Sequence, residues 1–557
     1  MQTLLLLSLV FAPLAFASVE PWALATLQIT AFAAAARIYI RGRAVYPNPL
    51  YKNLIPAVLG IALLGLLQAF NETPVTAAPA VLFTAWRPAT LNAVLVWLFY
   101  AAVMFAVPQI INTPQRFTRL MWTVFAMGVL IALIGMFQKT GDNTVVYGLR
   151  TVRGQAFGPF INRDHGAYFL AMAAMAGLGL FFSGWRALAA QQSRTRLFDL
   201  LAVQLLKLVM VGTLIYGIYQ TGSRGGLHSF AFAAAVTGFI AAGFVRTRKF
   251  RLAGFFGMAL LLTGYGVFVY QNKKLLGLAD GAFDRSVTIR FSMYQSGRAM
   301  LKDFPLLGSG LGAVEYAFPP YKRPDVPMQG LVRHVHSDWL ELFLQVGFAG
   351  GLIYNAGLAL ALFTFFKTWR NCLSFSLKAM YGGALGAVLA ALTHNFVEFG
   401  SQMPANALFF YTLVGALASA PPAWARRRPE DEDAPEPVPV KKSRALAAAA
   451  LAALLCLCTL PNVIAWVYDQ RAADAPYAEK VRRHAASLRW RPNPQYAFRL
   501  ALAHYNQAFK DPSAAPALLR TAQESLAPWL TRAPVNYDLN SLQKTIRYFQ
   551  AHPPKAR

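Results

Sequence analysis

Apolar stretches of about 20 residues recur along the whole chain, and they constrain its fold more than any other feature. They lie near residues 3–18, 20–40, 53–70, 90–110, 117–137, 165–184, 198–220, 226–245, 251–270, 339–366, 377–394, 404–420 and 445–467. A helix adds only about 1.5 Å per residue, so it needs about 20 apolar residues to cross a bilayer core. The pattern therefore predicts an all-α fold, a polytopic membrane helix bundle with about 12–13 spans.

Composition and charge agree with a membrane protein. Of the 557 residues, 56% are hydrophobic and only 14% are charged, whereas a soluble protein has about 25% charged residues. A formal charge of +28 would suggest nucleic acid as a partner in a soluble protein. In a membrane protein the first expectation for Lys and Arg is retention on the cytoplasmic side. We therefore expect the bilayer, and no nucleic acid, as a partner.

The cysteines and the N-terminus exclude two further readings. Cys372, Cys456 and Cys458 lie in or near apolar stretches, so they indicate neither a disulfide framework nor a zinc site. Metal-ligand spacing is absent elsewhere in the sequence, and we expect no metal and no cofactor. The start, MQTLLLLSLVFAPLAFASVE, contains an AFA-S stretch like a signal-peptidase site but lacks a basic n-region. We interpret it as the first membrane helix.

The loops between the apolar stretches alternate in character. One set is short and basic and includes Arg37–Lys52, Arg116–Arg119, Arg186–Arg196, Arg246–Arg251 and Lys367–Arg370. The positive-inside rule places this set in the cytoplasm. Alternation then puts the other segments outside: 71–89, 138–164, 221–224, 271–338, 395–403 and everything after about 468.

Four domains follow from this map. Residues 1–420 form a transmembrane domain that includes the external loop 271–338, and residues 421–444 form a charged, Pro-rich cytoplasmic linker. Residues 445–467 form the last span. Residues 468–557 form an external helical tail, in which NPQYAFRLALAHYNQAF and AAPALLRTAQESLAPWL resemble degenerate tetratricopeptide helices. A small helical cap fits the same pattern.

Under this topology the unusual polar residues gather outside. They occur in LRTVRGQAFGPFINRDHGAYFL, TGSRGG, TIRFSMYQSGRAMLKDFPLLGSGLG, RHVHSDWLE and THNFVEFGSQMPAN, the last of which carries His394 and Glu398. Arginine presents a rigid fork of donors that suits phosphate. An enzyme acting on a lipid-linked diphosphate would need such a cluster, although single arginines at membrane ends also snorkel toward water. PLLGSGLGA indicates a tight loop and not a dinucleotide site, because no strand precedes it.

The segment RHVHSDWLELFLQVGFAGG combines titratable groups with the start of an apolar stretch. Asp338 and Glu341 predict a capping box, with Asp338 accepting from the first-turn amides. Asp338, Glu341 and Gln345 share one helical face, which indicates a polar cavity or bundle interior. His336 precedes the cap, and a histidine side chain titrates near neutral pH, which suits a general base acting on a hydroxyl.

Five segments, in order, resemble the O-antigen ligase and polymerase family of bacterial envelope glycan assembly. They are GQAFGPFINRDHGAYFL, TGSRGGL, IRFSMYQSGRAMLKDFPLLGSGLG, HVHSDWLELFLQVGFAGG and THNFVEFGSQMPANALFF, within roughly residues 130–420. The resemblance implies a C-type, metal-independent glycosyltransferase of the bacterial inner membrane with its active site facing the periplasm. Such enzymes move a glycan from undecaprenyl diphosphate to lipid A-core in ligases, to a growing polysaccharide in polymerases, or to a protein in related oligosaccharyltransferases.

The resemblance also implies roles for individual residues. Arg224 and Arg290 match arginines that would hold the diphosphate, and His336 matches the family histidine, although Ser337 stands where asparagine is usual. These three are the expected catalytic residues. The expected substrate-binding residues are Arg153, Asn162, His165, Arg298 and His394. The implied reaction is an inverting displacement, since no carboxylate pair stands out as a nucleophile.

Three readings remain open within the enzyme class: ligase, polysaccharide polymerase and protein oligosaccharyltransferase. Outside that class the rival is a glycan or lipid transporter or flippase. Transporters tend to show internal repeats and ionisable groups near the membrane midplane. Here the candidate groups lie at the external ends of the spans, which favours an enzyme.

Overall fold

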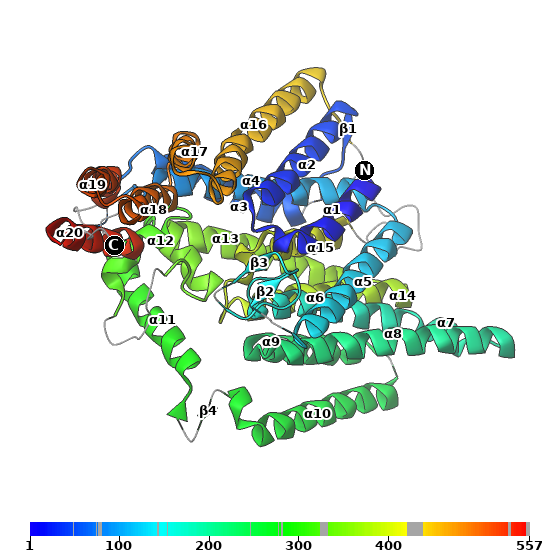
Figure 1. Cartoon of the computed structure of the whole chain (residues 1–557). Coiled ribbons are helices and arrows are strands. Elements are labelled where there is room, and N and C mark those ends of the chain that lie inside the picture. The colour runs from blue at the N-terminus through cyan, green and yellow to red at the C-terminus, as the bar shows by residue number, and fades with distance from the viewer. Residues whose placement is uncertain are drawn as a thin grey trace.

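The computed structural model describes residues 1–47, 49–73, 75, 81–141, 144–152, 154–245, 247–276, 278–279, 282–323, 332–419, 438–532 and 536–552. The long helices are α1 (Gln2–Leu14), α2 (Pro21–Ile40), α3 (Ile55–Ala69), α4 (Arg87–Ile110), α5 (Pro114–Gln138), α6 (Arg163–Ser183), α8 (Arg194–Thr221), α9 (Arg224–Gly243), α10 (Arg248–Gln271), α11 (Arg285–Asp303), α13 (Asp338–Asn371), α14 (Phe375–His394), α15 (Pro404–Ser419), α16 (Lys442–Ala472), α17 (Tyr477–Trp490), α18 (Pro494–Lys510), α19 (Ala515–Arg532) and α20 (Tyr537–Ala551). Figure 1 shows their arrangement.

The remaining elements are short. They are α7 (Trp185–Ala189), α12 (Val314–Ala317), the turns η1 (Phe16–Ser18), η2 (Pro49–Leu54), η3 (Lys273–Leu276), η4 (Pro319–Tyr321) and η5 (Gly400–Gln402), and the strands β1 (Arg43–Ala44), β2 (Val145–Val146), β3 (Arg150–Thr151), β4 (Leu278–Ala279), β5 (Ala282–Phe283) and β6 (Val438–Pro439). The strands pair antiparallel as β1–β6, β2–β3 and β4–β5. The predicted all-α fold is confirmed, because these two-residue strands build no layer of their own.

In the described part of the chain, 11 helices are long and apolar enough to cross a membrane, and α1 and α15 are shorter apolar helices. Each predicted apolar stretch overlaps one of these helices, in the same order. The first stretch differs from the prediction. α1 has 13 residues and ends at Leu14, not at 18, so its length of about 20 Å falls short of the roughly 30 Å hydrocarbon core.

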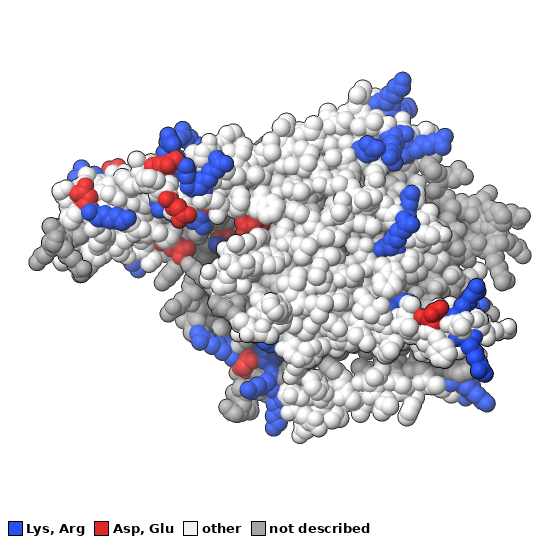
Figure 2. Space-filling model, turned by 45° about the vertical axis from the view of Figure 1, so that its right-hand side comes forward, with Lys and Arg blue, Asp and Glu red and all other residues white. Residues whose placement is uncertain are grey.

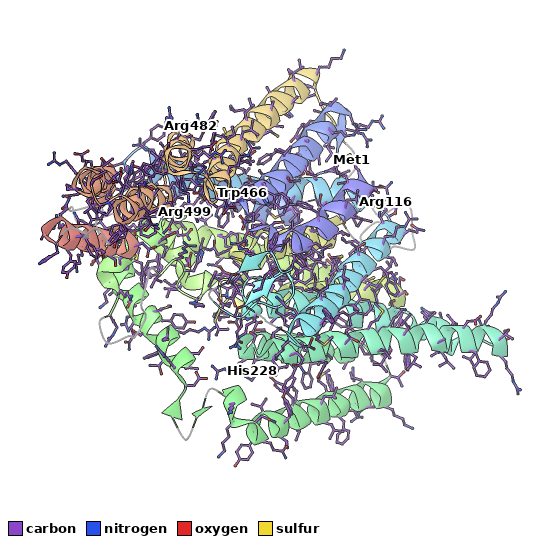
Figure 3. The ribbon with its side chains drawn as sticks, in the orientation of Figure 1. Met1, Arg116, His228, Trp466, Arg482 and Arg499 are labelled. Carbon is purple, nitrogen blue, oxygen red and sulfur yellow. The ribbon has the colours of Figure 1, made fainter. Side chains whose placement is uncertain are left out.

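The two ends of the helix bundle carry different charges. Figure 2 shows a broad band without charged side chains, a mostly basic end, and an opposite end where the tail carries both signs. Arg116 lies at the basic end, whereas Arg482 and Arg499 lie on the tail (Figure 3). At each of the two ends, a hydrogen bond joins segments that lie far apart in the sequence. At the basic end the amide of Val45 donates to Gln109 Oε1, at 2.8 Å; at the other end Lys139 Nζ donates to the carbonyl of Gln220, at 2.6 Å.

The predicted linker 421–444 falls mostly outside the described residues, which resume at 438. Its last part is not a free linker. Val438 and Pro439 form β6 and pair with β1, and α16 begins at Lys442. α16 then runs along α2 back to the end that carries the tail (Figure 1).

The tail helices α17 to α20 pack in sequence against one another and form a second apolar core. That core includes Leu519, Leu526 and Ile546, and it also takes in Trp86, which precedes α4 in the membrane bundle. The Trp86 ring stacks on Tyr316, with centroids 5.2 Å apart, and lies 5.8 Å from Trp529. Burying these large rings together fixes the tail against this end of the bundle.

α13 is broken where the loop 305–313 docks against it. Gly347 adopts φ +63° and ψ −171° inside the helix. The amides of Phe348 and Ala349, freed by the break, donate to the carbonyls of Pro305 and Leu306 at 2.7 and 3.1 Å. The predicted tight loop is confirmed, since Gly308, Gly310 and Gly312 have positive φ. The loop thereby satisfies backbone groups that the break would otherwise leave unpaired.

Substituting alanine for Gly347 is expected to destabilise the protein by about 3 kcal/mol or more. A Cβ at Gly347 would lie 2.1 Å from the carbonyl oxygen of Leu306, and the backbone there is left-handed. The matched control is Gly60→Ala in α3, where a Cβ meets nothing within 4 Å. We expect a clear fall in the detergent-solubilised melting temperature for Gly347→Ala and none for Gly60→Ala. Equal melting temperatures for the two variants would contradict the docking role.

Candidate active site

Two connections at the tail end of the bundle carry the candidate site: residues 332–337 before α13, and residues 395–403 between α14 and α15. The start of α13 differs from the predicted capping box. Ser337, not Asp338, caps α13, its hydroxyl accepting from the Leu340 amide at 3.3 Å. Asp338 instead accepts from the Ser401 amide at 2.8 Å. It thereby ties the two connections together, because its own amide donates to the Asn395 carbonyl at 3.0 Å.

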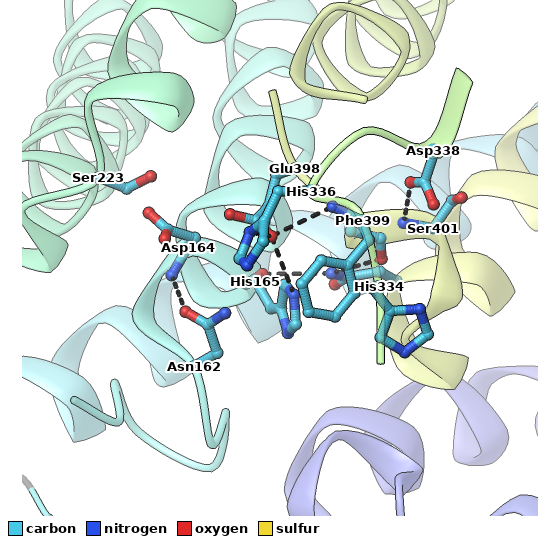
Figure 4. A network of polar contacts seen from close by, with 12 residues as sticks. Asn162, Asp164, His165, Ser223, His334, His336, Asp338, Glu398, Phe399 and Ser401 are labelled. Atoms are coloured by element: carbon cyan, nitrogen blue, oxygen red, sulfur yellow. Dashed lines mark hydrogen bonds and ion pairs between the residues drawn. The ribbon is translucent and has the colours of Figure 1, made fainter. Parts of the chain in front are cut away.

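Glu398 is the centre of the polar network in Figure 4. Its Oε1 lies 2.9 Å from His336 Nδ1, and its Oε2 accepts from Arg290 Nη2 at 3.0 Å. Arg290 Nη2 also lies 3.4 Å from Asp164 Oδ2 at the start of α6. The Glu398 side chain is only 1% exposed, whereas that of His336 is 28% exposed. A buried carboxylate thus holds an accessible histidine and an arginine side by side.

The charges in this network are balanced so that Glu398 stays ionised. Burial alone would raise the pKa of Glu398, but the neighbouring His165 and His336 hold it well below its usual value. Burial alone would lower the pKa of Arg290, and Glu398 and Asp164 raise it. An ionised carboxylate can only accept, so the hydrogen between Glu398 and His336 belongs to Nδ1. Nε2 of His336 is then the basic nitrogen, and no described residue bonds to it.

His336 adopts φ +51°, a left-handed conformation that is rare outside glycine and asparagine. The hydroxyl of Tyr294, one turn beyond Arg290 on α11, donates to the His336 carbonyl at 2.9 Å and so helps to hold this backbone. The Phe399 ring packs edge-on against His336, with centroids 5.0 Å apart. The imidazole is therefore fixed from its backbone, its Nδ1 and one ring edge.

Arg224 begins α9 and reaches the start of α11. It forms a two-pronged ion pair with Asp284, in which Nη2 donates to Oδ1 at 3.0 Å, and it donates to the Lys274 carbonyl at 3.1 Å. The hydrogen bond from Arg224 lowers the pKa of Asp284, against a smaller effect of burial. Asp284 also caps α11 by accepting from the Val287 amide at 3.0 Å. The same helix therefore positions Arg290 and anchors Arg224, which places both arginines on one side of the site.

Phe399 separates this network from a second one. Its ring stacks on His334 with centroids 4.3 Å apart, and packs edge-on against His165 on the other side, at 4.6 Å. His334 Nδ1 lies 2.8 Å from Glu341 Oε1, which also accepts from Gln345 Nε2 at 3.2 Å. In Figure 4, Asp164 and Ser223 lie to one side of Glu398, and His334, Asp338 and Ser401 to the other. The prediction that Asp338, Glu341 and Gln345 face away from lipid agrees with their burial.

The residues expected to bind substrate take different positions. Asn162 caps α6 by accepting from the Asp164 amide at 2.9 Å. His165 is buried, with Nε2 at 3.8 Å from Glu398 Oε1, beyond hydrogen-bonding distance. His394 is buried against Tyr168, with centroids 5.5 Å apart. Arg298 is exposed on α11, two turns beyond Arg290, and Arg153 lies outside the described residues. Asn162 and His165 therefore lie in the network, whereas His394 packs beside it and Arg298 faces water.

Glu398 and Asp164 are the two residues that the sequence reasoning did not assign a role. The available signal is that an acidic residue at the end of an apolar stretch is costly without a cationic partner. That signal does not identify the partner, because Arg290 lies 108 positions from Glu398 and 126 from Asp164. Among the described residues, no group of three or more His, Cys, Asp or Glu side chains is arranged to hold a metal ion.

Comparison with known proteins gives one match. The family model for O-antigen ligase matches residues 208–355, which is 148 of the 557 residues. A search of curated proteins finds no match. The matched segment contains the paired arginines and the candidate base, and it ends before Glu398. Residues 208–355 of this multi-pass membrane chain are therefore similar to the O-antigen ligase family.

Proposed function

We propose that the protein transfers a glycan from undecaprenyl diphosphate to an acceptor hydroxyl at the periplasmic face of the bacterial inner membrane. The O-antigen ligase match supports a ligase- or polymerase-like activity in general. One observation carries the finer proposal: buried Glu398 contacts both His336 Nδ1 and Arg290 Nη2. A carboxylate that orients an imidazole leaves Nε2 poised as a general base, beside a cation suited to a leaving phosphate.

The proposed step is a single displacement. His336 Nε2 takes the proton of the acceptor hydroxyl while that oxygen forms a bond to the anomeric carbon. The bond from this carbon to the diphosphate oxygen breaks, and the electron pair leaves with the diphosphate. Glu398 stabilises the imidazolium that forms, as a buried carboxylate does for histidine in hydrolase triads. Direct displacement inverts the anomeric carbon, and it requires no metal ion in this scheme.

The two arginines differ in how they would meet a diphosphate. Arg290 is held by Glu398, which is 1% exposed, so this pair is fixed in place. Arg224 is held by Asp284, whose side chain is 32% exposed and can turn into solvent at small cost. We infer that the donor diphosphate replaces Asp284 on the fork of Arg224, while Arg290 contributes its charge from the buried network.

The Arg224→Ala variant is expected to lower kcat/KM for the donor by about 10–100-fold, since it removes a charged phosphate contact. Asp284→Asn should act in the opposite direction, lowering the donor KM, because asparagine still caps α11 but no longer competes for Arg224. Lys302→Ala, at an exposed position on the same helix, is the control. The measurement is transfer from purified lipid-linked glycan by the protein in proteoliposomes. An unchanged donor KM in both site variants would remove Arg224 from donor binding.

Gene deletion followed by analysis of surface glycans tests the proposed function. Full-length polymer that stays on the lipid carrier and is not transferred to lipid A-core would indicate a ligase. Single repeat units on the carrier would indicate a polymerase. Loss of protein glycosylation would indicate an oligosaccharyltransferase. Surface and protein glycans that are unchanged in the deletion strain would contradict the proposed function. Reporter fusions near residues 300 and 520 test the sidedness, because both positions must lie outside the cytoplasm.

A further inference from the structure

A cavity of about 360 Å³ lies between the membrane bundle and the tail. Its walls come from α4 and α13, from the connection 395–403, and from the junction between α17 and α18. Aromatic rings from the bundle line it, among them Trp97, Tyr100 and Tyr354. Arg491 and Asn493 contribute from the tail. The tail therefore completes a cavity that the bundle alone would leave open.

This cavity is next to the transfer site but distinct from it. His334 and Asp338 line the cavity, whereas His336 and Glu398 do not. The Phe399 ring is the partition, with its centroid 4.3 Å from that of His334 and 5.0 Å from that of His336. A molecule seated in the cavity would thus approach His336 from the side opposite Arg224 and Arg290.

The polar lining of the cavity is rich in hydrogen-bond acceptors. Three carboxylates, Glu315, Asp338 and Glu341, contribute to it, together with the positive Arg333 and Arg491. Asp338 is buried, and its Oδ1 has no hydrogen-bond partner among the described residues. A buried acceptor without a donor is unfavourable unless a ligand or water supplies one.

The chemistry of the lining selects among possible occupants. An acyl chain would leave Asp338 Oδ1 without a donor. A diphosphate is itself only an acceptor, so it would supply no donor to the carboxyl groups of the lining. A saccharide offers many hydroxyl donors around an apolar ring face, which matches carboxylate acceptors set among aromatic side chains. A site built to receive hydroxyl donors discriminates strongly against ligands that lack them.

We propose that this cavity binds a carbohydrate segment of the acceptor, with the tail residues Arg491 and Asn493 closing the site. That the bound carbohydrate is the acceptor rests on the proposed function, but binding itself does not require transfer. The acceptor sugar occupies the tail side of Phe399 and the donor diphosphate occupies the arginine side. The reacting hydroxyl of the acceptor sugar extends past the Phe399 ring to reach Nε2 of His336.

Photocrosslinking tests this assignment. A benzoylphenylalanine is placed at Tyr316, an aromatic position in the cavity wall, in the full-length protein in its native membrane. The matched control carries the same probe at Leu260, which is 64% exposed on α10. Both are irradiated in the wild-type and the His336→Asn backgrounds, and the adducts are analysed by mass spectrometry. We expect the Tyr316 probe to gain a saccharide mass without polyprenyl diphosphate in both backgrounds, and the Leu260 probe to gain only lipid.

The outcomes separate this proposal from the proposed function. An adduct that carries polyprenyl diphosphate, phospholipid or peptide, or no adduct, overturns the assignment of the cavity even if transfer activity is present. A saccharide adduct supports it even if the donor or the reaction proves different. Arg491→Ala in the same protein should reduce the saccharide adduct. Arg482→Ala, at a tail position whose side chain is 74% exposed, should leave it unchanged.

Discussion

Replacing His336 with asparagine is expected to lower the turnover of glycan transfer by about 10²–10⁴-fold, the usual contribution of a general base. Asparagine is the informative substitution because the residue adopts φ +51°, which asparagine tolerates better than alanine. The backbone held by Tyr294 should therefore survive, and only the imidazole is lost. The measurement is transfer in membranes of a deletion strain that carries the variant, normalised to the amount of inserted protein.

Two comparisons make this result decisive. His552→Asn, at an exposed position near the end of α20, controls for a generic effect of the substitution. His336→Ala should be as inactive as His336→Asn if the imidazole matters. Activity in the asparagine variant together with inactivity in the alanine variant would assign His336 a backbone role and remove it from proton transfer.

Most of the fold could be predicted because it depends on local sequence. Spans such as 165–184 and 377–394 are continuous apolar stretches bounded by polar residues, and bilayer thickness fixes their length. The break at Gly347 was not predicted, because it depends on the loop 305–313 docking against α13. The short α1 was not predicted either, since the apolar sequence continues beyond Leu14 while the helix does not.

The candidate site was predicted in part, and the missing part is its long-range pairing. His336 and Arg224 could be chosen from their residue types beside the membrane ends, and Arg290 from the resemblance of its segment to the O-antigen ligase family. Glu398 could not, because its role comes from contacts with residues 62 and 108 positions away. The structure also gives both arginines carboxylate partners, where the sequence suggested cations free to meet phosphate. Only folding reveals which of those partners is exposed enough to exchange.

Glu398→Gln tests this pairing against a matched variant. We expect it to lower kcat by about 10²–10⁴-fold with little change in the donor KM, because a neutral amide cannot stabilise the imidazolium of His336. Asp164→Asn removes the other carboxylate from Arg290 without touching His336, so its kcat should fall by less than about tenfold. Equal losses in the two variants would mean that both carboxylates act only through Arg290.

The ionisation state of Glu398 follows from the lowered pKa of this carboxylate. A group with a folded-state pKa below its unfolded value contributes stability above the unfolded pKa, and this contribution is lost as pH falls through the folded pKa. Glu398 is therefore already ionised throughout the range from about pH 5 to 8, and infrared difference spectra of wild type minus Glu398→Gln should show its ionised carboxylate band unchanged across it. A protonated carboxyl band that appears in these spectra as pH falls from 8 to 5 would show that Glu398 titrates there, and a carboxylate that takes up its own proton cannot hold His336 as a base.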